Sequence, residues 1–295
     1  MFRELKERIK QKFYGHILAK INNTDARLSY EKEQRIKEIE LLRFQLEIAK
    51  HQAEILFSLL PLPQRHLTEN TVRPLSKNFT AHEVLDKLKQ EAPEAFKVWL
   101  ELSEAGRASY KGNPPDSCSV QANLGAGKFA AFCEGKLAGT VLDIGCGTQA
   151  TPLYLEKFPT DQIIGLDPLL PEEKHPFTFV QGYAEYLPFE DAVFDTVVAA
   201  TSFDHTLIPQ KALDEIYRVL KPFGHFIIWE AVHENSQRDF LNYNPYSAES
   251  FVPADKFHLF RFSKNSLFQF MTTKFYIHNY FIEGTSAMID AIKTK

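Results

Sequence analysis

The second half of the chain alternates short apolar runs with longer amphipathic segments. The apolar runs are rich in Val, Ile, Leu and Phe and end in turn-forming residues, which is typical of buried parallel strands. We therefore predict strands near Thr140–Ile144, Gln162–Leu166, Thr178–Val180, Thr196–Ala200 and His225–Glu230. Helices are expected between these strands. This alternation predicts an α/β fold with a doubly wound, mostly parallel sheet.

Further elements are predicted on both sides of this region. Ahead of it, two short helices are expected around Val84–Leu88 and Phe96–Leu102. Behind it, Ser266–Met271 is expected to form a helix and Ser286–Ile292 a last strand. In each segment, apolar residues recur at the spacing of the helix or strand that we predict there.

Residues 1–22 are predicted to form a basic amphipathic helix. Six Lys and Arg residues stand against two Glu residues, and apolar residues recur at helical spacing. Two interpretations of this helix stay open. It packs on its own protein or on a second subunit, or it lies on an anionic membrane surface.

A second helix is predicted to follow and to end near Leu60. Its apolar residues alternate steps of three and four over three heptads, which predicts a seam that packs against another helix. The seam positions are Ile39, Leu42, Leu46, Ala49, Ala53, Leu56 and Leu60. Small alanines permit close approach, so we favour a homo-oligomer joined through the N-terminal helices. A helical hairpin within one chain is the alternative.

The most informative segment is Val141–Gly147, an apolar run that ends in Asp143, Gly145 and Gly147. It predicts a buried strand that turns tightly into a ligand site, because glycine lets a ligand approach the main chain. Taken alone, this signal is ambiguous. Together with Ala150 it also matches the dinucleotide pattern GxGxxG/A, and Asp167 follows at the distance of a ribose-binding carboxylate.

Motifs further along the chain resolve this ambiguity. They are Ile163–Asp167, Phe179–Glu185, Leu187–Asp195 and Arg218–Gly224. In this order and spacing the chain resembles the class I S-adenosylmethionine-dependent methyltransferases. The resemblance implies a seven-stranded sheet that ends in an antiparallel hairpin, S-adenosylmethionine as the cofactor, and a methyltransferase domain over residues 79–295 behind a helical extension over residues 1–78.

The resemblance also implies a set of cofactor contacts. Asp143 and the turn through Gly145, Cys146 and Gly147 would face the methionine part, and Asp167, followed by Pro168, would accept hydrogen bonds from both ribose hydroxyls. The family commonly has an acid after the third strand to reach the adenine, and here the acid is displaced to Glu185. The remaining expected contacts are Tyr183, Ala184 and Thr201. A lid over the cofactor is expected at Tyr110–Gly125, with a plain surface loop as the alternative.

The candidate catalytic residues follow the fourth and fifth strands. Sugar and natural-product O-methyltransferases with this core often have a histidine where His205 stands and an acid where Glu230 stands. An imidazole titrates near neutrality and suits a general base for an alcohol. We therefore expect His205 to be the base, with Asp204 or Glu230 orienting it. His233 is a second candidate, and a histidine that only caps its loop is the structural alternative.

A metal centre is not expected from the sequence. Asp255 and His258 stand three residues apart and could share a helical face, with His233 and Glu234 as further ligands. We interpret this segment instead as one that contacts the substrate. Its rings would stack on a sugar or a planar acceptor, or fill the core. They are Tyr243, Tyr246, Phe251, Phe257, Phe260 and Phe262.

The leading hypothesis is O-methylation of a sugar, a glycan or a similar hydroxylated small molecule. Methylation of a quinone or lipid precursor is the alternative that would explain a basic amphipathic start. A non-catalytic nucleotide-binding scaffold is a third possibility, and an NAD-dependent oxidoreductase would leave the later motifs unexplained.

Composition narrows the choice of partner and compartment. The net charge is −4 and the pI about 6.2, so no nucleic-acid partner is expected. Three cysteines match neither a disulfide framework nor a zinc site, which favours a reducing compartment. Without a signal peptide or a long apolar stretch, the expected location is the cytoplasm, with peripheral membrane contact through residues 1–22 as an option.

Overall fold

The computed structural model describes residues 80–112, 123–147, 151–171, 174–234, 236, 238–247 and 252–294. All of them belong to one compact unit. The predictions for the extension over residues 1–78, including the basic helix, the heptad seam and the oligomer, lie outside the described residues. So does most of the expected lid over residues 110–125.

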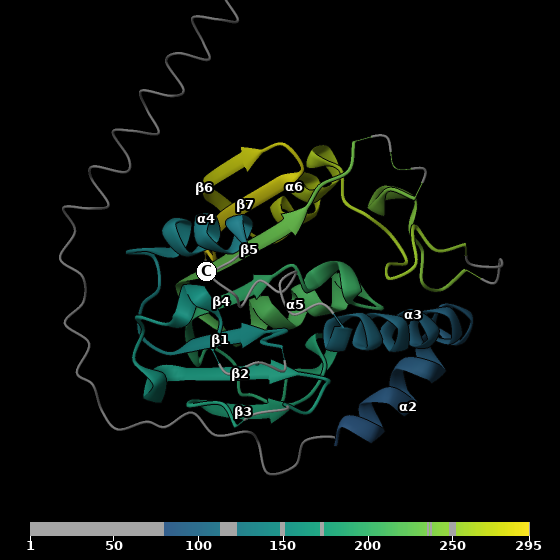
Figure 1. Cartoon of the computed structure of the whole chain (residues 1–295), viewed down its shortest axis with the longest axis horizontal. Coiled ribbons are helices and arrows are strands. Elements are labelled where there is room, and N and C mark those ends of the chain that lie inside the picture. The colour runs from purple at the N-terminus through teal and green to yellow at the C-terminus, as the bar shows by residue number, and fades with distance from the viewer. Residues whose placement is uncertain are drawn as a thin grey trace, which may run out of the picture. The chain divides into compact units, whose positions relative to one another are not determined.

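Seven strands of the described residues form one sheet. They are β1 (Val141–Ile144), β2 (Ile163–Asp167), β3 (Thr178–Gln181), β4 (Phe194–Ala200), β5 (Leu220–Ala231), β6 (Tyr276–Glu283) and β7 (Ser286–Ile292). Their order across the sheet is β3-β2-β1-β4-β5-β7-β6 (Figure 1). The pairings of β7 with β5 and with β6 are antiparallel, and the other four pairings are parallel. The switch point, at which the strand order reverses, lies between β1 and β4, which pair parallel to each other. The predicted mostly parallel sheet with a terminal antiparallel hairpin is confirmed.

Five α-helices of the described residues accompany the sheet. They are α2 (Ala81–Glu91), α3 (Pro93–Gly112), α4 (Leu124–Cys133), α5 (Pro209–Val219) and α6 (Lys264–Thr272). The two short helices expected ahead of the sheet correspond to α2 and α3. The start of α2 is fixed by a capping box, in which Thr80 and Glu83 each accept a hydrogen bond from the other's backbone N–H.

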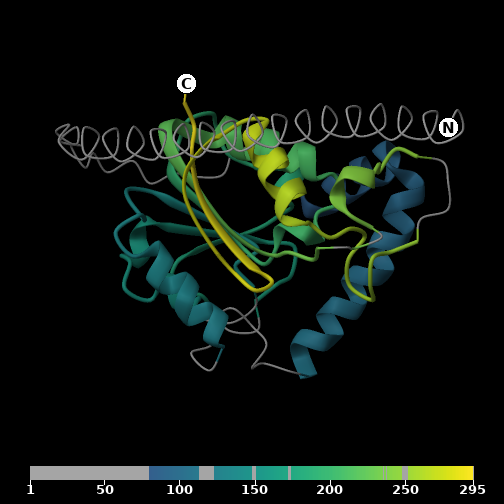
Figure 2. The same cartoon turned by 90° about the horizontal axis from the view of Figure 1, so that it is seen from above.

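The helices bury both faces of the sheet, because the strand residues alternate between two apolar clusters. Val141, Val198 and Ile227 point to the face covered by α4, where Phe129 is fully buried. Their neighbours in the strands point to the opposite face, where α5 and α6 pack together with residues of α2 and α3. Figure 2 shows α4 and α6 on opposite sides of the sheet.

The expectation of a helix between every pair of parallel strands is wrong in three places. The described residues between β1 and β2 form only the short 3-10 helices η2 (Leu153–Leu155) and η3 (Thr160–Gln162), and those between β2 and β3 form no helix. Those between β3 and β4 form only the 3-10 helix η4 (Ala184–Tyr186). Proline explains the difference, since it lacks the N–H that a helix interior needs. Pro152 and Pro159 interrupt the first connection, and three prolines fall within residues 168–176 of the second.

No helix of the described residues is both long and apolar enough to cross a membrane.

Candidate active site

A tight turn after β1 forms one half of the site. Gly145 and Gly147 have φ angles of +75° and +77°, in the left-handed region that favours glycine. Gly145 has no room for a side chain, because an added Cβ would lie 2.3 Å from Cβ of Ser202. At Gly147 an added Cβ would have no atom of the described residues within 4 Å. The turn is therefore tightly packed at Gly145 and leaves space at Gly147.

Asp143 is the buried carboxylate of this half. Its Oδ1 accepts a hydrogen bond from the Tyr154 hydroxyl at 2.8 Å, while Oδ2 has no hydrogen-bond partner among the described residues. Burial raises the pKa of Asp143 to about 7, and the charge of Asp167 adds a smaller effect of the same sign. The hydrogen bond from Tyr154 acts in the opposite direction and lowers the pKa. An unpartnered buried acceptor is unfavourable, so Asp143 fits a site whose ligand donates a hydrogen bond.

Asp167 closes β2 beside this turn. Its Oδ2 accepts a hydrogen bond from the N–H of Gly147 at 2.9 Å, and its Oδ1 from the N–H of Leu169 at 2.8 Å. An ionised carboxylate has about four acceptor sites, so these two bonds alone do not exhaust it. Asp167 therefore joins the ends of β1 and β2 and is suited to accept from ligand hydroxyls as well.

Two further expected contacts are Cys146, within the turn after β1, and Pro168, directly after β2. The side chain of Cys146 is buried, and a Cβ added at Gly165 would lie 2.8 Å from its Sγ. Pro168 follows Asp167, and its carbonyl accepts a hydrogen bond from the side-chain amide of Gln181 at 3.0 Å. The thiol of Cys146 thus belongs to the packed core, and a ligand contact at this position would use the backbone.

The expected contacts after β3 have different roles. The Tyr183 ring packs edge-on against Trp99, with the ring centroids 5.9 Å apart, and Ala184 is buried at the start of the 3-10 helix η4 (Ala184–Tyr186). The displaced acid, Glu185, is buried and accepts hydrogen bonds from the N–H groups of Leu207 and Ile208 at 2.7 and 3.2 Å. Glu185 therefore ties η4 to the segment ahead of α5.

Thr201 follows β4 in a strained backbone conformation. Its φ angle is +51°, which is unfavourable for a β-branched residue, and its N–H donates to the carbonyl of Trp229 at 2.7 Å. Strain of this kind often marks functional sites. This conformation of Thr201 ends β4 just before Asp204 and His205.

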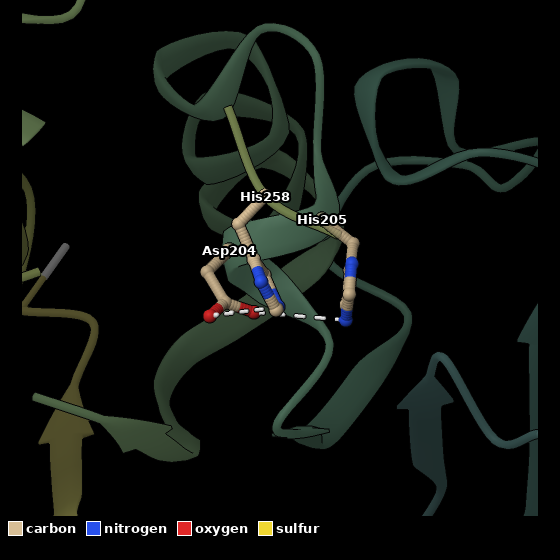
Figure 3. A group of neighbouring side chains, drawn as sticks. All are labelled: Asp204, His205 and His258. Atoms are coloured by element: carbon tan, nitrogen blue, oxygen red, sulfur yellow. Dashed lines mark ion pairs between the residues drawn. The ribbon is translucent and has the colours of Figure 1, made fainter. Parts of the chain in front are cut away.

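Three side chains meet beyond the end of β4 (Figure 3). Asp204 and His205 belong to the 3-10 helix η5 (Phe203–His205), and His258 comes from the segment ahead of α6. Nε2 of His258 lies 3.5 Å from Oδ2 of Asp204, and Nε2 of His205 lies 4.0 Å from Oδ1 of Asp204. Asp204 and His258 are buried, whereas 34% of the His205 side chain is exposed. The group therefore reaches the protein surface through His205.

Arg261 and Asp255 brace this group. Nη1 of Arg261 donates to Asp204 at 2.7 Å and its Nε donates to Asp255 at 2.8 Å, while Oδ1 of Asp255 lies 2.7 Å from Nδ1 of His258. Burial by itself would raise the pKa of Asp204, but the two histidines and Arg261 hold it below its ordinary value. Asp204 is therefore an ionised carboxylate in the protein interior.

Asp255 and His258 do not share a helical face, which was one possibility that their spacing left open. The backbone N–H groups of Phe257 and His258 both donate to Oδ1 of Asp255, at 2.9 and 3.1 Å, which makes a turn in place of a helix. Asp255 contacts Nδ1 of His258, and Nε2 of that ring faces Asp204. Glu234, the other ligand considered from the sequence, instead accepts the backbone N–H of Lys264 at 3.1 Å.

Glu230 and His233 lie at the end of β5. The Glu230 carboxylate is fully buried and accepts the N–H of Phe203 at 2.9 Å. Burial, reinforced by the charge of Asp204, raises the pKa of Glu230 well above its ordinary value. His233 is exposed, and its backbone N–H donates to the carbonyl of Phe262. Burial lowers the pKa of His205, and the charge of Asp204 opposes this effect.

Two features of the site had no signal in the sequence. The indole N–H of Trp99 donates to the carbonyl of His205 at 2.7 Å, which places α3 against the end of β4. Arg261 reaches Asp204 across 57 positions of the chain. Neither contact follows from spacing, since both depend on how distant segments pack.

Residues 142–228 match a family model described as a methyltransferase domain. This segment runs from β1 into β5 and contains Asp143, Asp167 and His205. The chain contains a methyltransferase domain over these residues.

Individual relatives match over about a third to a half of the chain. A demethylmenaquinone methyltransferase of Lactococcus lactis is 35% identical over 113 residues, which are 34% of this chain and 45% of the relative. The enzyme of that name from Thermotoga maritima is 29% identical over 145 residues, 45% of this chain and 63% of the relative. The chain thus spans about half the length of the curated relatives it matches.

Solved structures of similar shape include the Burkholderia thailandensis 1,6-didemethyltoxoflavin-N1-methyltransferase with bound 1,6-didemethyltoxoflavin and S-adenosylhomocysteine. It is 16% identical, with a TM-score of 0.49 over 78% of this chain and 99% of that one.

The residues of the methyltransferase domain fit its cofactor, S-adenosylmethionine. Bound there, the cofactor supplies an electrophilic methyl group on a sulfonium sulfur. The unpartnered Oδ2 of Asp143 suits its ammonium group, the space at Gly147 suits close approach to the backbone, and Asp167 suits its vicinal hydroxyls. All three lie outside the carboxyl ends of the strands, where ligands bind in doubly wound sheets.

Proposed function

We propose that this chain transfers a methyl group from S-adenosylmethionine to a quinone or a related lipid precursor. The observation that carries the proposal is the likeness to demethylmenaquinone methyltransferases, 35% identity over 113 residues in one case and 33% over 116 in another. This likeness favours the alternative considered from the sequence over methylation of a sugar.

The aromatic surroundings of His205 support a planar, apolar acceptor. The His205 and His258 rings lie with centroids 4.3 Å apart, the Trp99 indole is hydrogen-bonded to the backbone of His205, and Trp99 also contacts Tyr183. Aromatic rings stack favourably on one another in offset or edge-on geometry. A quinol ring has flat faces that such side chains can contact.

The chemical task of these residues is to align the acceptor and to manage one proton. Methyl transfer is an in-line displacement, so alignment at near-attack distance supplies much of the rate enhancement. The hydroxyl of a reduced quinone must lose its proton for its oxygen, or the adjacent ring carbon, to become a strong nucleophile. His205 is partly exposed, and its lowered pKa favours the neutral imidazole that can accept a proton, so we assign it to accept this proton.

The test is an acceptor comparison with the full chain. Purified protein is incubated with S-adenosylmethionine and either reduced demethylmenaquinone or a nucleotide-linked hexose, and methylated product is followed by mass spectrometry. The expected result is methylation of the quinol only. The protein with Asp167→Ala is the control for transfer that depends on the cofactor. Methylation of the hexose alone would refute the proposal and restore the sugar hypothesis.

A lipid acceptor would also give the basic helix predicted for residues 1–22 a task, because such an acceptor lies in a membrane. We propose that this segment brings the enzyme to an anionic surface. Vesicles with anionic lipid should retain the full chain and lose it when residues 1–22 are removed. Equal retention of both forms would contradict this proposal and favour assembly as the role of the segment.

A further inference from the structure

The Asp204, His205 and His258 side chains have the composition and arrangement of a metal site. The structure assigns to these three side chains a binding site for one divalent transition-metal ion, such as Zn²⁺. This departs from the sequence analysis, which expected no metal. It rests on the geometry of the cluster and is independent of the acceptor.

The donor atoms converge. Nε2 of each histidine faces the Asp204 carboxylate, and one ligand atom from each of the three residues lies within 4.8 Å of the other two (Figure 3). The measured separations from the carboxylate are 3.5 and 4.0 Å. Ligands about 2.1 Å from a zinc ion at a tetrahedral angle are about 3.4 Å apart. Small side-chain rotations therefore suffice to close the site around an ion.

His258 has its other ring nitrogen held by an acceptor. Nδ1 of His258 lies 2.7 Å from Oδ1 of Asp255. Metal-ligating histidines in proteins almost always donate their second N–H to a carboxylate or a carbonyl in this way. This contact directs the Nε2 lone pair of His258 toward the centre of the cluster.

The carboxylate is supported as well. Arg261 donates to both Asp204 and Asp255. Its guanidinium therefore orients the ligand Asp204 directly and also holds Asp255, the residue that contacts the ligand His258. Ligating carboxylates are themselves commonly hydrogen-bonded. The Arg261 charge opposes a cation nearby, but Asp204 and Asp255 together carry two negative charges against its single positive charge.

The donor set indicates which ions would bind. Two imidazole nitrogens and one carboxylate oxygen suit Zn²⁺, Fe²⁺ and similar ions, and this combination leaves coordination positions open. The exposed side of the cluster, at His205, is where an acceptor oxygen would complete the shell. With an ion bound, His205 holds the ion rather than a proton.

Cobalt provides a direct test, because Co²⁺ can replace Zn²⁺ and absorbs visible light when it is bound by protein ligands. The full chain, without an affinity tag and after removal of metals with a chelator, is titrated with Co²⁺ in the absence of cofactor and acceptor. The expected result is a visible absorption band that saturates at one ion per chain and disappears when Zn²⁺ is added.

Substitutions locate the ion. His205→Ala and His258→Ala should each weaken Co²⁺ binding at least tenfold, and Asp255→Asn should weaken it by about 10- to 100-fold through His258. His82→Ala is the matched control, because His82 and Asp86 form an exposed histidine–carboxylate pair on α2 with 3.8 Å between Nε2 and Oδ2. His205 is partly exposed, so its variant remains informative if His258→Ala fails to fold.

Two results would overturn the assignment. One is the absence of a saturable band in the folded wild-type protein. The other is a band that His205→Ala and His258→Ala leave unchanged, which would locate the ion elsewhere. Because neither result involves methyl transfer, failure here leaves the proposed acceptor untouched, and failure of the acceptor assay leaves the metal site untouched.

Discussion

Replacement of Asp143 by Asn should stabilise the cofactor-free protein at pH 8 and leave its stability nearly unchanged at pH 4. The wild-type side chain is fully buried, and only one of its oxygens has a partner among the described residues. Asn keeps an oxygen that can accept the Tyr154 hydroxyl but removes the buried charge. The substitution therefore isolates the free energy of ionising this group inside the protein.

The size of the effect follows from the pKa. A rise from 3.8 to about 7 corresponds to about 4 kcal/mol, since each tenfold change in proton affinity is worth about 1.4 kcal/mol. Below pH 4 both folded and unfolded chains carry the proton, and no penalty arises. Between about pH 4 and 7 only the folded chain keeps it, so wild-type stability falls as pH rises. Above pH 7 the full penalty is present.

Thermal unfolding of the two proteins at several pH values measures this difference. For a unit of this size about 1 kcal/mol shifts the melting temperature by about 2 to 4 °C. The Asn variant should therefore melt several degrees above wild type at pH 8 and together with it at pH 4. Asp161→Asn, at an exposed position in η3, is the control and should show no such trend. A difference that does not change with pH would refute the reasoning.

The same charge should link cofactor binding to proton release. If Asp143 must ionise to accept the ammonium group of S-adenosylmethionine, binding at pH 6 releases close to one proton from this residue. Calorimetric titration in buffers of different ionisation enthalpy counts released protons. The Asn variant should bind the cofactor more weakly and release fewer. Equal proton release from both proteins would remove Asp143 from the cofactor site.

Three further substitutions test other parts of the site. Asp167→Ala should weaken binding of S-adenosylhomocysteine at least tenfold, because a hydrogen bond to a charged group is worth about 1.5 to 3 kcal/mol; unchanged affinity by calorimetry would exclude the ribose contact. Gly145→Ala should destabilise the fold by more than 1 kcal/mol, since its Cβ would clash with Ser202; a wild-type urea midpoint would contradict the strain. His205→Ala should lower kcat at least a hundredfold with little change in cofactor affinity, and full turnover would remove His205 from the mechanism.

The half of the candidate site suited to the cofactor was largely predictable, because its signals are local. The apolar run before Asp143, the glycines at 145 and 147 and the strand ending in Asp167 are contiguous patterns, and each encodes its own strand and turn. Parallel strands of a doubly wound sheet present their carboxyl ends at one edge. Residues that end neighbouring strands therefore meet there without further information.

The acceptor half depended on packing between distant segments. The sequence placed Asp204 and His205 after β4, but His258 joins them across more than fifty positions, through the turn at Asp255. Trp99 reaches His205 from α3, and Glu185 turns away to hold the segment ahead of α5. Such contacts leave no periodic pattern along the sequence, because they depend on which apolar faces of distant segments pack together. The chain alone determined the sheet and its glycine turn, and only the tertiary structure decided which side chains stand beside His205.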